Sequence, residues 1–193
     1  MKPQHLKQAE IFAFLAAVFL VGVFLLEKQR RETPPILVLS EEEATYRFDS
    51  GSSEIPPAFV RALNEIKIPE LDSLSKRCAC DIIEVVGHTD EEAVSRRYSD
   101  LDREMVEAFN RGEVENLRPG SNMDLGMMRA LAIVQILKTS QRRGRYLQDI
   151  RFFFPYSAGQ MILLDSTLAV QSAQGEDDRA RRRIEVRLRR SLK

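Results

Sequence analysis

The sequence contains no tryptophan, only two cysteines and two histidines, and no excess of charge of either sign. Lysine and arginine together number 29, as do aspartate and glutamate, so overall charge does not favour nucleic acid or an acidic polymer as a partner. Basic and aromatic residues do not alternate, which argues against binding of single-stranded nucleic acid. A zinc site normally needs four ligands, and His5, His88, Cys78 and Cys80 form no such cluster in the sequence. We therefore expect no metal, no cofactor and no nucleic-acid partner.

The two cysteines are separated by one residue. In an extended strand, Cys78 and Cys80 would point to the same face, too far apart for an unstrained bridge. The sequence predicts two small, half-buried side chains at the start of a strand. An intermolecular disulfide remains an alternative if the domain lies outside the cytoplasm.

No arrangement of residues typical of an enzyme is present. His88 has no cysteine or serine nearby that could act as a nucleophile, and a G-x-S-x-G motif is missing. Gly51-Ser52-Ser53 is too short and wrongly flanked for a phosphate-binding loop. We expect a binding protein rather than an enzyme.

One long apolar run is present, from Ile11 to Leu26. Its sixteen residues would reach about 24 Å as a helix, and adding Leu6 to Glu10 makes a full span of about 30 Å possible. A cleaved signal peptide would end in small residues, whereas this run continues into Glu27-Lys28-Gln29-Arg30-Arg31. A buried core helix would have a polar face, which is missing here. The sequence predicts an uncleaved transmembrane helix within residues 1–30.

The rest of the chain has the pattern of an α+β domain. Residues 31–43 are interpreted as a linker because Pro34 and Pro35 disfavour a helix, although Ile36 to Leu39 is apolar enough for a first strand. The further expected elements are a segment at 44–48, helices at 57–67 and 125–137, and strands at 82–86, 149–154 and 183–188. Strands separated by helices predict a split βαβ two-layer sandwich over residues 44–193, with the helices on one face of the sheet.

Three motifs place charged side chains at the ends of these elements. The strand at 82–86 ends in Gly87-His88-Thr89-Asp90, which presents a carboxylate. The second helix opens with Asn122-Met-Asp-Leu-Gly-Met-Met-Arg129-Ala130, which places a guanidinium on its first turns. The last strand begins with Arg182-Arg183-Ile184-Glu185. A carboxylate beside a guanidinium suits a ligand that carries both an ammonium and a carboxylate group.

In these motifs the chain resembles the OmpA-like, or OmpA/MotB C-terminal, peptidoglycan-binding family. The family signature has a strand that ends in G-H-T-D, then N-x-x-L-S-x-x-R-A and a closing R-R-V-E strand. The resemblance implies that Asp90 binds the ammonium group and Arg129 the carboxylate of diaminopimelate in the wall peptide. It also assigns Thr89, Asn122 and Arg183 to the peptidoglycan site.

The chain departs from the family pattern at three places. Gly126 replaces a serine at what we interpret as a capping position, and Arg181 stands where the closing motif usually has asparagine. The third departure is an insertion of 31 residues at 91–121, between Asp90 and Asn122. Apolar residues at steps of 3 and 4 predict an amphipathic helix over 91–110. This helix would either decorate the domain or form a lid or partner surface beside the site.

The resemblance also implies a location and partners. It places the N-terminus in the cytoplasm and the domain in the periplasm, attached to the inner membrane, although Lys28, Arg30 and Arg31 weigh slightly against this orientation. The main hypothesis is a homodimeric tether that holds a membrane complex to peptidoglycan. The apolar run also resembles the helix of MotB-type motor stators, in which Glu10 would carry protons beside a polytopic MotA-like partner. A structural module that has lost wall binding is the third hypothesis.

Overall fold

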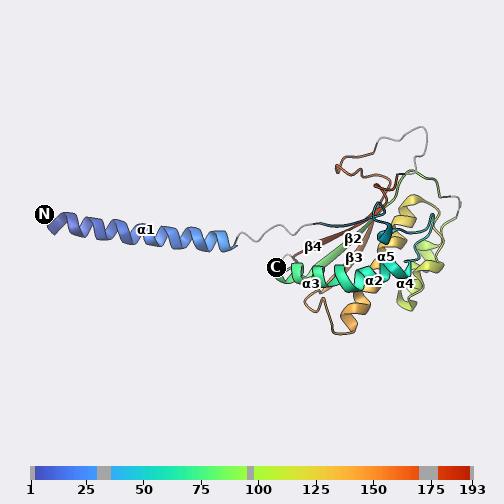
Figure 1. Cartoon of the computed structure of the whole chain (residues 1–193), viewed down its shortest axis with the longest axis horizontal. Coiled ribbons are helices and arrows are strands. Elements are labelled where there is room, and N and C mark those ends of the chain that lie inside the picture. Colours follow the sequence, from blue (N-terminus) through green and yellow to red (C-terminus); the bar gives the residue numbers. More distant parts are fainter. Residues whose placement is uncertain (1–2, 30–35, 95–97, 170–177, 192–193) are drawn as a thin grey trace. The chain divides into compact units, whose positions relative to one another are not determined.

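The computed structural model describes residues 3–29, 36–94, 98–169 and 178–191. The chain divides into two compact units, Met1–Thr33 and Pro34–Lys193. The first unit contains the helix α1 (Pro3–Gln29), and the second contains all the strands and the other helices of the described residues (Figure 1). The functional residues expected for wall binding all belong to the second unit.

Helix α1 occupies the segment for which the sequence predicts a membrane anchor. Its described side chains are those of residues 10–24, and all of them are exposed except the half-buried Gly22. The large apolar side chains among them include Phe12, Phe14 and Phe19, which are each about 70% exposed. Within the part of the chain that the structure describes, no helix combines the length and the apolar character that crossing a membrane requires.

Four strands form one mixed sheet in the order β1-β4-β2-β3. The strands are β1 (Leu37–Ser40), β2 (Ile82–His88), β3 (Phe152–Gly159) and β4 (Arg183–Arg189). Strand β4 is antiparallel to both of its neighbours, with Val186 opposite Leu37 on one side and Val85 on the other. Strand β2 runs parallel to β3, with Ile82 opposite Phe152. Parallel neighbours need a crossover connection, which here contains α5 (Asn122–Arg142).

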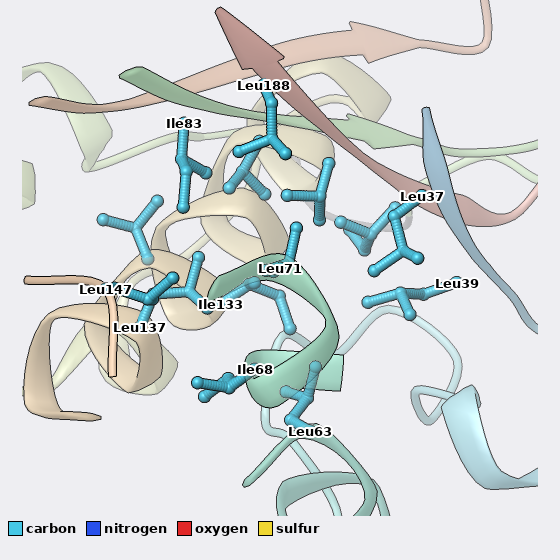
Figure 2. Close-up of a cluster of buried hydrophobic side chains, with 14 of the residues drawn as sticks. Leu37, Leu39, Leu63, Ile68, Leu71, Ile83, Ile133, Leu137, Leu147 and Leu188 are labelled. Carbon is cyan, nitrogen blue, oxygen red and sulfur yellow. The ribbon is translucent and has the colours of Figure 1, made fainter. Parts of the chain in front are cut away.

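The helices cover one face of this sheet. They are α2 (Pro57–Ala62), the π-helical turn η2 (Leu63–Lys67), α3 (Ile68–Cys78), α4 (Leu101–Arg111) and α5, with short 3-10 turns η1 (Ala44–Tyr46) and η3 (Val114–Asn116). Figure 2 shows leucine and isoleucine side chains from the strands meeting those of α3 and α5 in a common core. Ile83, Ile133 and Leu137 are fully buried there. The expected α+β architecture, with a four-stranded sheet and helices, is therefore present.

The first strand expected at Ile36 to Leu39 is present as β1, so the boundary of the expected linker over 31–43 is wrong at its C-terminal end. Residues Leu37–Ser40 form β1, and Leu37 and Leu39 are buried in the core. Pairing with β4 satisfies the backbone of this short segment and buries its alternate apolar side chains. The sheet domain therefore begins before residue 44.

The first helix of the domain is longer than the interval 57–67 that the sequence predicts. A proline stands at position 69, yet the helical segment continues through η2 into α3, and this last helix ends at Cys78. A π-helical turn shifts the backbone hydrogen bonds, so a proline that lacks an N–H follows without breaking the helix. Leu71 and Leu74 of α3 then contribute to the core.

The prediction of two separate thiols is also wrong. Cys78 and Cys80 form a disulfide, with their Cα atoms 5.2 Å apart. Cys78 ends a helix rather than opening a strand, and Ala79 takes a left-handed conformation with φ of 50°. This turn brings the two cysteines together, which the alternation of an extended strand would not do.

The helix of the 91–121 insertion begins ten residues later than expected. Residues 91–94 are not helical, and α4 covers Leu101–Arg111 and stops at Gly112, whose φ is 80°. Leu101 and Ala108 pack with Met128 and Leu131 of α5 in a second, smaller cluster. The insertion therefore has a core of its own beside α5, and its first residues are left to form a loop.

Candidate functional site

Asp90 lies two residues beyond the end of β2 and is 3% exposed. Its Oδ1 accepts a hydrogen bond from the backbone N–H of Glu92 at 3.3 Å. Its Oδ2 accepts one from the N–H of Asp178 at 3.2 Å and forms an ion pair with Arg182. Both oxygens of the Asp90 carboxylate, which follows β2, are thus held by hydrogen bonds or an ion pair.

Arg129 lies on the second turn of α5 and is 2% exposed. Its Nε donates to the carbonyl of Ser52 at 3.0 Å, and Nη2 donates to the carbonyl of Asp49 at 3.3 Å. The guanidinium also lies 4.7 Å from the centre of the Phe48 ring. These contacts fix the guanidinium and tie the loop at residues 49–52 to α5.

Glu41 connects Arg129 to Asp90 through Arg182. Glu41 Oε1 lies 3.6 Å from Arg129 Nη1, and Oε2 accepts from Arg182 Nε at 2.7 Å. Burial lowers the pKa of Arg129 to about 10, against the opposing effect of the Glu41 carboxylate. Arg129 therefore remains a cation at neutral pH. We call the chain Arg129–Glu41–Arg182–Asp90 the ion network.

Asn122, the first residue of α5, closes the loop that follows Asp90. Its Nδ2 donates to the carbonyl of Asp90 at 3.2 Å and to that of Glu92 at 3.0 Å. The helix start is capped by Ser121, whose hydroxyl accepts from the N–H of Asp124. These contacts hold the loop after Asp90 against the start of α5.

The close approach of α5 to β2 depends on two glycines. A Cβ on Gly87 would lie 2.0 Å from the carbonyl oxygen of Gly126, and a Cβ on Gly126 would lie 2.8 Å from that of Gly87. Our interpretation of Gly126 as a capping position is therefore wrong, because Ser121 caps the helix and Gly126 permits backbone contact. This contact sets the distance between the segments that carry Asp90 and Arg129.

A cavity of about 540 Å³ opens beside the ion network. Four of the five predicted site residues line it: Thr89, Asp90, Asn122 and Arg129. Arg182 of the closing motif lines it as well, together with charged residues that the motifs did not indicate, namely Glu41, Arg47, Asp49, Glu92 and Arg179. The lining includes four carboxylates and four guanidinium groups, which suits a ligand that carries charges of both signs.

Thr89 presents a buried hydroxyl to this site. The residue is 1% exposed, and its backbone N–H donates to the carbonyl of Gly159 at 2.9 Å. Within the described residues, its Oγ1 has no hydrogen-bond partner. Most buried hydroxyl groups are hydrogen-bonded, so this one is a candidate contact for a ligand.

Arg183, the fifth predicted residue, is not among the residues that line this cavity, and its assignment to the peptidoglycan site stays a prediction. It is 4% exposed, and its Nε donates to Glu185 Oε1 at 2.9 Å. Its Nη2 lies 3.3 Å from the carbonyl of Leu163. Arg182, the residue before β4, is the one that reaches Asp90.

The insertion contributes to the cavity wall through its flanks. Glu92, Ala93, Val94 and Pro119 all line the cavity, whereas α4 packs on α5 through the second cluster. Helix α4 thus packs on α5 and does not line the cavity, whereas loop residues of the insertion do.

Comparisons with known proteins give little further information. No family model matches the chain, and no curated protein matches it. The structure aligns with the crystal structure of a protein described as MotB-like from Desulfovibrio vulgaris, with 18% identity and a TM-score of 0.45, over 81% of this chain and 75% of the other. We draw no argument from a likeness at this level.

Proposed function

We propose that this chain binds the bacterial cell wall by holding the diaminopimelate side chain of peptidoglycan. The observation that supports this proposal is that Asp90 and Arg129, which come from separate elements, line one cavity. The diaminopimelate side chain ends in an ammonium and a carboxylate on one carbon. Asp90 takes the ammonium group, and Arg129 takes the carboxylate.

The contacts of Arg129 leave donors for a ligand. Arginine has five N–H groups, and Arg129 directs two of them to backbone carbonyls. Because Glu41 lies 3.6 Å from Nη1, its charge balances the buried cation without a short hydrogen bond. A ligand carboxylate therefore finds a fixed guanidinium with unused N–H groups, in a site partly shielded from water.

Binding of the ammonium group requires a local exchange at Asp90. Arg182 is paired with Asp90 through Nη1 and with Glu41 through Nε. An incoming ammonium replaces the first of these contacts, while Arg182 keeps the second. The exchange conserves the number of positive charges beside Asp90, which limits its cost.

Attachment to the inner membrane through residues 11–26 is part of the proposal, with the domain in the periplasm. The exposed apolar side chains of α1 support it, because such a surface normally contacts lipid or another protein. The homodimer, the polytopic partner and proton transport by Glu10 rest on the sequence alone and stay predictions. Recovery of the full chain in the soluble fraction of broken cells would contradict attachment to the membrane.

Sedimentation with purified cell-wall sacculi tests the proposal. The full-length chain, kept in solution with mild detergent, should sediment with sacculi that contain diaminopimelate. Sacculi with lysine at the same position are the matched control, because lysine keeps the ammonium group and lacks the side-chain carboxylate. Equal sedimentation with both kinds would contradict the proposed recognition, and sedimentation with neither would favour a module that has lost wall binding.

A further inference from the structure

Two of the four arginines that line the cavity have no partner among the residues that the structure describes. Arg129 and Arg182 belong to the ion network. Arg47 and Arg179 also line the cavity, and neither has a hydrogen bond or ion pair within the described residues. We infer that Arg47 and Arg179 form a second anion site, which takes a second carboxylate of the wall peptide. This inference rests on the proposed function.

The position of Arg47 is fixed by its neighbours. Tyr46 and Phe48 on either side are each 5% exposed and pack edge-on against the ring of Phe59. Arg47 is half-buried, and its Nε is fully enclosed without an acceptor in the described part of the chain. A buried guanidinium group without an acceptor is uncommon in folded proteins, and a carboxylate in the cavity supplies one.

The other charges around the cavity do not neutralise these two arginines. Glu41 and Asp90 are engaged in the ion network, and the Glu92 carboxylate accepts from the hydroxyl of Ser50 at 3.4 Å. Asp49 and Glu92 are exposed, so solvent weakens their repulsion of an anion. After one ammonium and one carboxylate have bound at Asp90 and Arg129, positive charge remains at Arg47 and Arg179.

The wall peptide has a carboxylate to offer such a site. Its D-glutamate is joined through the side chain and so keeps a free α-carboxylate, and a peptide that ends at diaminopimelate has a terminal carboxylate as well. The cavity volume of about 540 Å³ lies within the range of sites that enclose a small ligand. The second anion site therefore favours an acidic peptide over one whose carboxylates are amidated.

Calorimetric titration of the full-length chain in detergent tests this inference. The probes are the tripeptide L-Ala-γ-D-Glu-meso-diaminopimelate, the same peptide amidated on D-glutamate, and the same peptide amidated at its C-terminus. The amide at the carboxylate that binds Arg47 and Arg179 should weaken binding about tenfold, and the other amide should have no effect. This comparison identifies which carboxylate is bound.

The double variant Arg47→Gln with Arg179→Gln should bind the non-amidated tripeptide more weakly than wild type does. Its affinity should equal that of wild type for the amidated peptide that wild type binds less tightly. Arg61→Gln is the matched control, because Arg61 is an exposed arginine on α2 outside the cavity. Tripeptide binding by the double variant at the wild-type affinity would overturn this inference and leave the proposed function standing. Failure of the wild-type chain to bind any of the three peptides would contradict both.

Discussion

Asp90 and Arg182, which are 92 positions apart in the sequence, form an ion pair at the wall of the cavity. The carboxylate expected to hold a ligand ammonium is therefore already beside a cation of the protein. Arg182 also contacts Glu41, and Glu41 in turn lies beside Arg129. A ligand ammonium at Asp90 would therefore have to replace Arg182, which shares Glu41 with Arg129.

Replacing Arg182 should strengthen ligand binding at Asp90 and lower the stability of the fold, because Arg182 both competes for Asp90 and stabilises the ion network. In Arg182→Gln, the ligand ammonium no longer displaces a cation, so we expect meso-diaminopimelate to bind about tenfold more tightly. The free energy of unfolding should fall by about 2–4 kcal/mol, because Asp90 and Glu41 lose a partner in a buried network. Calorimetric titration and urea denaturation measure the two effects, with Arg61→Gln as the control. Weaker binding by Arg182→Gln would show that Arg182 orients Asp90 for the ligand instead.

The glycine contact between β2 and α5 should be sensitive to a single methyl group. Gly87→Ala places a Cβ 2.0 Å from a backbone oxygen that cannot move by itself, so we expect a loss of about 3 kcal/mol or more in the free energy of unfolding. Gly126→Ala first meets the Ser157 hydroxyl at 2.4 Å, so adding Ser157→Ala should recover part of its loss. The same addition should not rescue Gly87→Ala. Stability of Gly87→Ala within about 0.5 kcal/mol of wild type would contradict this packing.

The free energy of unfolding should fall in acid, in part because the carboxylate of Glu185 on β4 is lost by protonation. Burial alone would raise the pKa of Glu185, but His88, Arg187 and Arg183 around its carboxylate hold that pKa well below its usual range. A carboxyl with a lowered pKa in the folded state stabilises the fold at neutral pH, and this stability is lost as the pH falls below the usual carboxyl range.

Glu185→Gln removes this contribution and tests its sign. The variant should be less stable than wild type at neutral pH. The difference should shrink as the pH falls below about 4, because Glu185 then gains a proton in the unfolded chain before it does in the folded one. Urea denaturation at several pH values measures this difference, with the exposed Glu54→Gln as a control. A difference that stays constant or grows in acid would contradict the lowered pKa.

Much of the sheet and of α5 follows from local sequence patterns. The expected strand at 183–188 matches β4, and the expected helix at 125–137 lies within α5. The two largest errors have non-local causes. Residues 37–40 belong to the sheet domain and not to a linker because β4 pairs with them, and the first helix continues past residue 67 because the leucines of α3 reach the core. Neither cause is visible in a short window of sequence.

The motifs that carry the family resemblance pointed to Asp90 and Arg129, and the structure places both at one cavity. The carboxylate that links them through Arg182 was not predicted. Glu41 stands in an acidic run with Glu42 and Glu43, a pattern typical of a solvated surface, yet it is 2% exposed and joins two arginines. Partners of this kind depend on which distant segments pack together, so charge patterning along the chain does not reveal them.

The binding of meso-diaminopimelate to wild type and to Asp90→Asn tests the central claim most directly. Asparagine keeps the size of the side chain and removes the charge that holds the ammonium group, and Asp149→Asn, at an exposed position, is the matched control. Thermal unfolding of each variant should first show that the domain remains folded. In a calorimetric titration, wild type and Asp149→Asn should bind alike, and Asp90→Asn should bind about 10- to 100-fold more weakly. Equal affinity of folded Asp90→Asn and wild type would contradict the account.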